Sequence, residues 1–378
     1  MSVDARMHVD HVGSLLRPQA LKDAFAAHGR GELPAATLAA VQDAAIRDVL
    51  ARQEAIGLPV VTDGEYRRLN WQVSFSEVQG WDQWKPAWDA YRANPTGRKP
   101  GELALTRGED AVVSFRTPVT ARLRLERNFP LQEFGFAAAH AHATVKATIM
   151  GPDRVAQMCD IDASPDYGDL DELLSDVAAV QREMVAELLD AGCRYIQLDE
   201  PSYTGYVDPP TRERMLARGE DPSANLDRAV AATNAVMAGF HDRATFAVHI
   251  CRGNRAGMWH REGSYDAIAE RLFAGLDAER LLLEYDSERA GGFEPLRFVP
   301  AGRTVVLGLI TTKSSAIESS DALISRVEDA SHYVAPANLA ISPQCGFASG
   351  MAGNDLTEDQ QWRKLEQMLE TARLIWND

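Results

Sequence analysis

The sequence is poor in cysteine: it has four in 378 residues, too few for a disulfide framework and typical of a chain whose thiols stay reduced. We interpret two of them, Cys159 and Cys193, as packing residues. The sequence also lacks any apolar run of about 18 residues and so predicts no transmembrane helix. Its polar, acidic start does not fit a signal peptide. We therefore expect a cytoplasmic protein.

Basic residues are also few, with 39 Lys and Arg against 55 Asp and Glu, which gives a net charge of −16. Nucleic-acid binding and attachment to an anionic membrane both rely on positive charge. The composition therefore argues against nucleic-acid and membrane partners and leaves the oligomeric state open.

A short apolar run followed by a helical pattern recurs along the chain. The runs lie at 7–13, 58–64, 145–151, 194–201, 244–250, 280–286, 303–310 and 338–344. Helical spacing of apolar residues is found at 35–56, 169–191, 222–240, 264–275, 319–334 and 356–376. Strands that alternate with helices predict an α/β fold with parallel βαβ units, and eight strands close a (β/α)8 TIM barrel. A doubly wound open sheet is the alternative.

One interval, at about 70–140, interrupts this alternation and is rich in Trp, Tyr and Phe. We predict an aromatic-rich subdomain there, inserted after strand two of a single barrel domain that spans 1–378. The segment 117–128 within it alternates like a hairpin strand. Loops at the C-terminal ends of barrel strands line active sites, so the insertion either contributes to the site or only caps the barrel.

Candidate metal ligands lie where the later strands end. His249 and Cys251 end one run, and alternate residues of an extended segment point the same way, so both can hold one ion. Glu284 ends the next run and Cys345 follows the last one. Two thiolates with an imidazole and a carboxylate select zinc over magnesium or calcium. Their long separations suit a site assembled across a barrel mouth.

Six segments in order, HVGSLLRP, VVTDGEYRR, YIQLDEP, HICRGN, LLLEYD and SPQCGFASG, resemble the catalytic domain of cobalamin-independent methionine synthase. The resemblance runs from about residue 8 to 376 and is nearest to the short, single-barrel members of that family. It implies a TIM barrel with Zn2+ held by His249, Cys251, Glu284 and Cys345. It further implies a zinc-dependent methyltransferase that binds the thiol of homocysteine as a thiolate and yields methionine. Zinc lowers the pKa of a bound thiol, which agrees with this chemistry.

The same resemblance implies residues that bind the amino-acid substrate. Ser14 is expected at its carboxylate, and Glu65 and Asp199 at its ammonium group, because two carboxylates suit one cation. The alternative is a turn residue at Ser14 and a strand-end cap at Asp199. Lys313 stands where the family has a His that is thought to protonate the leaving group. We expect a catalytic role for Lys313, either orienting an anionic donor or acting as an acid.

The methyl donor is left open. Met158 stands near the place of a Trp on which folate stacks in the family, and Lys313 replaces the His. The expected partners are thus a small-molecule thiol and a methyl donor, which is a folate, a methylated corrinoid protein or a small S- or N-methyl compound.

Three rival functions share some of these features. Epoxyalkane–coenzyme M transferases also combine zinc with a barrel and alkylate a thiol, but coenzyme M has no ammonium group for Glu65 and Asp199 to hold. A zinc hydrolase is disfavoured because two thiolates make zinc less electrophilic. A structural zinc site in a binding protein is disfavoured because such sites usually draw their ligands from closely spaced loops.

Overall fold

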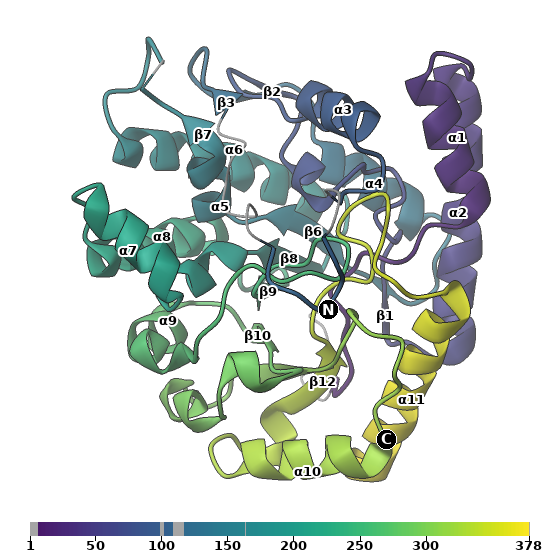
Figure 1. Ribbon diagram of the computed structural model, residues 1–378, viewed down its shortest axis with the longest axis vertical. Helices are drawn as coiled ribbons and strands as arrows, with labels where there is room; N and C mark the ends of the chain where they lie inside the picture. Colours follow the sequence, from purple (N-terminus) through teal and green to yellow (C-terminus); the bar gives the residue numbers. More distant parts are fainter. Residues whose placement is uncertain (1–6, 99–101, 109–116, 163, 378) are drawn as a thin grey trace.

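The computed structural model describes residues 7–98, 102–108, 117–162 and 164–377. Its centre is a six-stranded sheet in the order β12-β11-β10-β9-β8-β6, with all neighbours parallel (Figure 1). The strands are β6 (Ala147–Met150), β8 (Tyr195–Asp199), β9 (Thr245–Ile250), β10 (Arg280–Glu284), β11 (Thr304–Ile310) and β12 (Leu339–Pro343). Every residue in these strands is buried, as in parallel sheets covered on both faces.

Two further segments extend the sheet at its edges. β1 (Val60–Val61) pairs in parallel with β5 (Thr144–Val145), which lies one residue before β6. At the opposite edge, Val9 forms a parallel bridge with Ile341 of β12. All eight predicted strand segments thus pair through their backbones, and an α/β fold with a parallel sheet is confirmed.

The first and second of these segments lie against each other. The Leu15 amide donates to the Gly64 carbonyl at 3.1 Å, and the Thr62 hydroxyl donates to the Gly13 carbonyl at 2.6 Å. Among the described residues these contacts are not a strand ladder, so closure of the sheet into a barrel stays a prediction.

Helices follow the strands and surround them (Figure 1). The six predicted ones are α2 (Ala35–Ile56), α6 (Leu170–Asp190), α8 (Pro222–Met237), α9 (Ala269–Gly275), α10 (Ser320–Ser331) and α11 (Glu358–Trp376). The others are α1 (Gln19–Gly29), α3 (Trp84–Ala93), α4 (Phe129–Ala138), α5 (Pro152–Met158) and α7 (Pro209–Ala217). Short 3-10 turns are η1 (Trp71–Ser74), η2 (Pro201–Tyr206), η3 (Tyr265–Ala267), η4 (Glu288–Ala290), η5 (Glu294–Phe298) and η6 (Pro336–Asn338). Side-chain caps fix helix starts: Asp169 begins α6, and Thr357 forms a capping box with Gln360 at α11.

The interval at about 70–140 has its own short strands, β2 (Val78–Gln79), β3 (Thr117–Pro118) and β4 (Arg124–Leu125). β4 pairs with β2 in antiparallel fashion, whereas β3 pairs in parallel with β7 (Cys159–Asp160). The prediction of one hairpin strand over 117–128 is therefore wrong, because the segment contains two short strands with different partners, separated by residues that include the buried Val119 and Leu123. Residues 99–101 and 109–116 lie outside the described residues, and a separate subdomain stays a prediction.

A charged network is buried beneath the sheet. The Asp10 carboxylate pairs with Lys146 at 2.9 Å and with Arg280 at 3.3 Å, and it accepts a hydrogen bond from Tyr195. Burial alone would raise the pKa of Asp10, but Lys146 and Arg280 reverse this and lower the pKa to about 2. The network connects the N-terminal segment to β8, to β10 and to the residue directly before β6.

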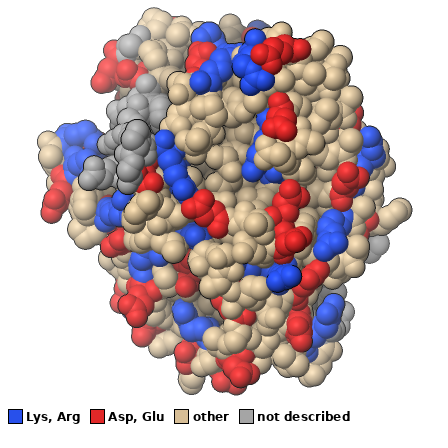
Figure 2. Space-filling model, turned by 45° about the vertical axis from the view of Figure 1, so that its right-hand side comes forward, with Lys and Arg blue, Asp and Glu red and all other residues tan. Residues whose placement is uncertain are grey.

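Charges are mixed on the surface. On the face shown in Figure 2, Lys and Arg side chains alternate with Asp and Glu side chains and do not gather in one patch. In the described part of the chain, no helix combines the length and apolarity needed to cross a membrane.

Candidate metal centre and substrate pocket

Three predicted metal ligands meet beyond the C-terminal ends of the strands. His249 lies in β9, Cys251 directly follows this strand, and Cys345 follows β12. One ligand atom of each residue lies within 4.8 Å of the others, and all three are buried. Both ring nitrogens of His249 are buried without a hydrogen-bond partner among the described residues. A buried polar group without a partner costs about 1–3 kcal/mol. The imidazole and two thiols therefore fit a soft metal ion such as zinc.

The pKa values of the two thiols in this group are shifted in opposite directions. A hydrogen bond from Cys251 is the main reason why the pKa of Cys345 lies well below its ordinary value, against the effect of burial. The same hydrogen bond and burial together raise the pKa of Cys251 well above its ordinary value. Burial lowers the pKa of His249, but the neighbouring Cys345 outweighs it and the net shift is upward. The contact between the two thiols therefore favours the thiolate form of Cys345 over that of Cys251.

Glu284 lies beside this group and is fully buried, but in the described residues it is not one of the three that converge. Its Oε2 accepts from the Arg252 amide at 2.7 Å, and its Oε1 is 3.4 Å from a guanidinium nitrogen of Arg289. Its charge still raises the pKa of His249 and of Cys251. The position of Glu284 at a strand end could be predicted from the sequence, but the donors that hold its carboxylate could not. The role of Glu284 as a metal ligand stays a prediction.

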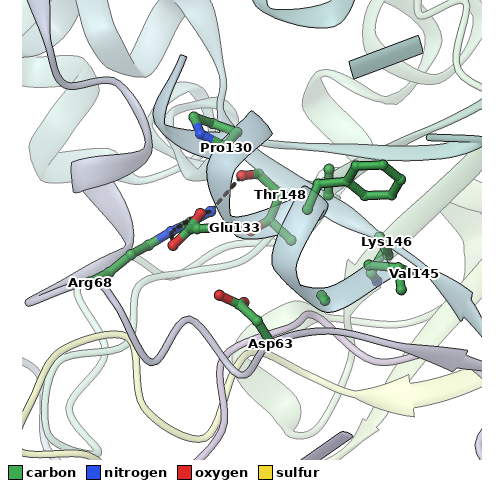
Figure 3. Close-up of a pocket in the computed structure, with 10 residues that line it drawn as sticks. Asp63, Arg68, Pro130, Glu133, Val145, Lys146 and Thr148 are labelled. Atoms are coloured by element: carbon green, nitrogen blue, oxygen red, sulfur yellow. Dashed lines mark hydrogen bonds and ion pairs between the residues drawn. The ribbon is translucent and has the colours of Figure 1, made fainter. Parts of the chain in front are cut away.

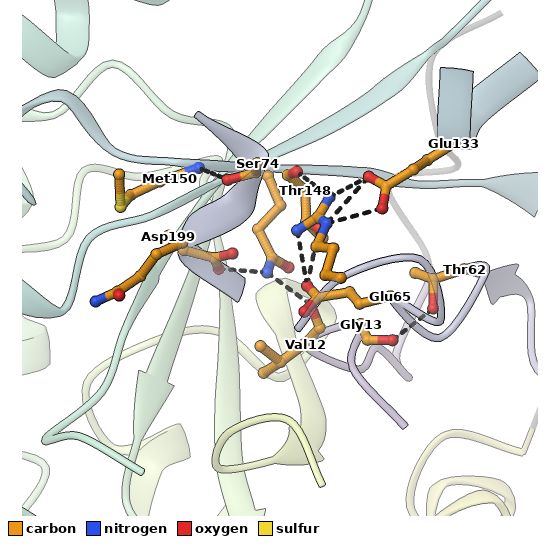
Figure 4. Close-up of polar contacts among 12 residues, drawn as sticks. Val12, Gly13, Thr62, Glu65, Ser74, Glu133, Thr148, Met150 and Asp199 are labelled. Carbon is orange, nitrogen blue, oxygen red and sulfur yellow. Dashed lines mark hydrogen bonds and ion pairs between the residues drawn. The ribbon is translucent and has the colours of Figure 1, made fainter. Parts of the chain in front are cut away.

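Glu65 and Asp199, the two carboxylates expected at the substrate ammonium, face a common region (Figure 4). Glu65 Oε1 accepts from Arg68 and from Thr148, both at 3.1 Å, while its buried Oε2 has no partner among the described residues. Asp199 accepts from Gln197 at 2.7 Å. Burial raises the pKa of Asp199 to about 7, with the Glu65 charge adding to the effect. Burial also raises the pKa of Glu65. An ammonium group would stabilise the ionised form of Asp199 and would give the unpartnered Oε2 of Glu65 a donor.

Arg68 contacts two buried carboxylates, Glu133, as Figure 3 shows, and Glu65. Its guanidinium donates to both oxygens of Glu133, at 2.6–3.0 Å, and to Glu65. Glu65 has a φ of 60°, which residues other than glycine rarely adopt. Its amide donates to the Asp63 carboxylate at 2.9 Å, and Arg17 donates to its carbonyl at 2.9 Å. These contacts fix the unusual backbone and aim the carboxylate.

Ser14 is placed between the two halves of the site. A Cβ on Gly346 would come within 1.8 Å of the Ser14 hydroxyl oxygen, so this hydroxyl lies directly against the residue after Cys345. The amide of Phe347 donates to the Ser14 carbonyl at 2.9 Å. A Cβ on the preceding Gly13 would approach Glu65 Oε1 at 3.9 Å. The structure therefore brings Ser14 to the cysteine turn and the preceding Gly13 to Glu65.

Lys313 is buried, with 1% of its surface exposed, and its ammonium nitrogen has no partner among the described residues. Its charge contributes to the lowered pKa of Cys345, so it lies within electrostatic range of the metal group. Met158 belongs to the apolar cluster that also contains Phe75 and Trp81.

The two remaining cysteines pack in the core. Cys193 is buried and donates to the Tyr195 carbonyl at 3.3 Å, and Cys159 is buried in the Met158 cluster. All four cysteines of the chain are free of disulfides. Their interpretation as packing residues agrees with this burial.

Sequence reasoning missed the residues that hold and flank the predicted ones. Arg68 follows Glu65 by three residues in VVTDGEYRR, and this spacing was the available signal. Gln197 precedes Asp199 by two residues on the same strand face. No sequence pattern indicates a role for Arg154 or Arg261, because the scarcity of hydrogen-bond partners around them among the described residues is a property of the folded chain.

Polar and thiol side chains gathered at the C-terminal ends of parallel strands are the arrangement of an α/β enzyme. The family described as "Cobalamin-independent synthase, Catalytic domain" matches residues 112–373. The chain belongs to this family, and it is a methyltransferase of the cobalamin-independent methionine synthase type.

Relatives of similar length support the assignment. The uncharacterized protein YxjH of Bacillus subtilis (strain 168) is 36% identical over 98% of this chain and 95% of its own length. The methionine synthase of Saccharolobus solfataricus is 22% identical over 96% of this chain and 93% of its own length.

Two solved structures share the fold. A protein from Listeria monocytogenes, assigned as a vitamin-B12-independent methionine synthase, superposes with a TM-score of 0.73 at 24% identity and 98% coverage of both chains. A B12-independent methionine synthase from Shewanella, in complex with selenomethionine, has a TM-score of 0.69 at 19% identity and 98% coverage of both chains.

Proposed function

We propose that this protein is a zinc-dependent methyltransferase that methylates the sulfur of homocysteine to give methionine. The observation that carries the proposal is the buried His249–Cys251–Cys345 group, with an unpartnered imidazole, beside the carboxylates of Glu65 and Asp199. A thiol-bearing amino acid has a soft sulfur that suits the metal ion and an ammonium group that suits the two carboxylates. The selenomethionine bound to the Shewanella relative is an amino acid of the same shape.

His249, Cys251 and Cys345 would hold the zinc ion, with Glu284 as the fourth ligand and the one most readily displaced. Zinc supplies a Lewis acid that lowers the pKa of the substrate thiol to near neutrality. Glu284 is already held by Arg252 and Arg289, so it can leave the metal without becoming an unpaired charge.

The remaining residues position the substrate. Glu65 and Asp199 bind its ammonium group, and Ser14 binds its carboxylate beside the cysteine turn. Methyl transfer is a displacement at carbon that needs sulfur, methyl carbon and leaving atom in line, so orientation supplies much of the rate. Lys313 either orients an anionic methyl donor or acts as an acid toward its leaving group.

We further propose that the chain is one (β/α)8 barrel domain with an insertion after strand two, and that it works in the cytoplasm. The hydrogen bonds from the Leu15 amide to the Gly64 carbonyl and from the Thr62 hydroxyl to the Gly13 carbonyl support closure between the first and second strand segments.

The test is a panel of methyl donors, a methylfolate, a methylated corrinoid and small S- and N-methyl compounds, each incubated with homocysteine and the zinc-loaded protein. Formation of methionine is measured by mass spectrometry. X-ray absorption at the zinc edge, with and without homocysteine, should show one added sulfur neighbour. An unchanged metal shell would refute thiol activation. Alkylation of coenzyme M by an epoxide, without methionine from any donor, would identify the alternative alkyl transferase.

A further inference from the structure

Arg154 is a buried cation for which the described residues provide no ion-pair partner. It lies in the first turn of α5, and its exposed fraction is 9%. Its backbone amide donates to Glu200 Oε1 at 2.9 Å, but the Nε atom of its guanidinium is buried without a hydrogen-bond partner among the described residues. The nearby Glu200 carboxylate is taken up by the amides of Asp153 and Arg154 and by Ser202. A buried charge without a partner is costly and needs a reason.

Two further buried cations share this region with Arg154. Burial and then the charges of Arg255, Arg261, Lys313 and Arg154 lower the pKa of His260 to about 3. Arg255 is paired with Glu102 at 2.7 Å. Arg261, exposed by 7%, donates only to the carbonyl of Pro201, and Lys313 has no partner among the described residues. We call Arg154, Arg261 and Lys313 the cation cluster; none of the three forms an ion pair with a carboxylate in the part of the chain that the structure describes.

The acidic groups that influence the cation cluster are held by other donors. Asp208 pairs with Arg107 at 2.8 Å, and Asp286 pairs with Arg289 at 3.0 Å. Asp153 accepts from Gln157 at 2.8 Å. The charges of these carboxylates lower the positive potential, but as far as the chain is described none of them forms an ion pair with the cluster.

The cation cluster and the ammonium pocket act on different members of the metal group. The charges of Arg154 and Arg261 interact with Cys251, and that of Lys313 interacts with Cys345. The charge of Asp199, in contrast, interacts with His249. The carboxylates of Glu65 and Asp199 suit the ammonium group of the thiol substrate. The cation cluster therefore suits a second molecule that approaches the sulfur of that substrate.

We propose that the cation cluster binds an anionic group, a carboxylate or a phosphate, of a small-molecule methyl donor. This inference rests on the proposed function, because it takes the second molecule to be the donor. Guanidinium groups bind such oxyanions through paired hydrogen bonds, and a buried ammonium adds a compact charge. Donors that carry only positive charge are excluded by repulsion from the same three residues.

The first experiment measures anion binding without turnover. Inorganic phosphate and glutarate are titrated into the full-length protein by calorimetry, and the tighter probe identifies the phosphate or the carboxylate class. Arg154→Gln and Arg261→Gln should each weaken binding by about 10- to 100-fold, the usual loss of a hydrogen bond to a charged group. Arg297→Gln, which removes an exposed ion pair with Asp266, is the matched control and should bind like the wild type.

A second readout separates donor binding from structural damage. Each variant is checked by thermal unfolding, and Arg154→Lys should restore part of the anion affinity. With an active donor, Arg154→Gln should raise the KM for the donor and leave the KM for homocysteine unchanged. A merely structural role would raise both.

The inference is overturned if neither probe binds the wild type, or if both variants bind as tightly as the control. Normal zinc and homocysteine binding in that case would leave the proposed function intact. Cluster-dependent anion binding without any zinc or homocysteine binding would have the opposite meaning, because the anion site would stand and the methyl-transfer proposal would fail.

Discussion

Asp199 and His249 occupy paired positions on the neighbouring parallel strands β8 and β9. Neighbouring strands lie about 4.8 Å apart, so the carboxylate that we assign to the substrate ammonium starts one strand spacing from the imidazole that we assign to zinc. The two groups interact electrostatically: burial raises the pKa of Asp199, and the neighbouring His249 lowers it. A short amino-acid thiol can therefore reach both with its two ends.

The first prediction concerns metal content. The wild-type chain should bind about one zinc ion, and Cys251→Ser or Cys345→Ser should each lose it, because an alcohol is a far poorer ligand than a thiolate. Cys193→Ser is the control, since Cys193 is buried in the core and donates to the Tyr195 carbonyl instead. Metal is measured by mass spectrometry after dialysis. Full retention of zinc by both ligand variants would rule out this site.

Glu284→Gln should behave differently from the cysteine variants. The carboxylate is held by Arg252 and Arg289, so we expect zinc affinity to fall only about 10- to 100-fold, the range seen when groups that support a metal site are changed. Competition with a chelator of known affinity measures this change. A loss as complete as in Cys345→Ser would make Glu284 a permanent ligand, and an unchanged affinity would remove it from the site.

The ammonium pocket can be tested with a matched pair of thiols. Glu65→Gln and Asp199→Asn should each weaken homocysteine binding by about 10- to 100-fold, because each removes a charged partner of the ammonium group. Neither variant should weaken 4-mercaptobutyrate, which has the same sulfur and carboxylate but no amine. Dissociation constants from calorimetry check both statements. Equal losses for the two thiols would show that the carboxylates serve the fold and not the ammonium group.

A fourth prediction concerns stability against acid. Burial raises the pKa of Asp10, but Lys146 and Arg280 outweigh it and the folded-state value is about 2, below the unfolded value of 3.8. The ionised carboxylate therefore stabilises the fold above about pH 4, and this contribution, about 2 kcal/mol, is lost as the pH falls through 2. Urea unfolding of the wild type across this range measures it.

Asp10→Asn at neutral pH should cost about 3–5 kcal/mol of unfolding free energy, because Lys146 keeps its buried charge without the carboxylate. The difference from the wild type should shrink toward pH 2. Asp266→Asn, which breaks an exposed pair with Arg297, should change stability by less than about 1 kcal/mol. A pH-independent effect of Asp10→Asn would contradict the electrostatic explanation.

Much of the fold was predictable from apolar periodicity. The eight strand segments and six helices follow from residues whose spacing already separates buried from exposed faces. Pairing inside the interval at about 70–140 was not predictable, since β3 and β4 take partners more than 30 residues away along the chain. Such partners are chosen by packing of buried residues such as Val119, which local alternation does not reveal.

The site was predictable only in part, for a related reason. His249, Cys251 and Cys345 sit at strand ends, and parallel strands bring their ends together. The sequence does not indicate that Glu284 is held by Arg289, nor that Arg154 and Lys313 are buried without an ion-pair partner among the residues that the structure describes. Those properties depend on which donors and acceptors remain after folding, and a linear pattern contains no such information.

The contact between Ser14 and Gly346 couples two events that a reaction scheme treats separately. Because the hydroxyl that we assign to the substrate carboxylate lies against the residue next to Cys345, ordering of this turn by the proposed metal ion would also set the position of the hydroxyl. By thermodynamic reciprocity, metal affinity and substrate affinity must then rise together by the same factor. A cell short of zinc would hold an enzyme that is also slow to capture its amino acid, and abundant substrate would help the enzyme keep its metal.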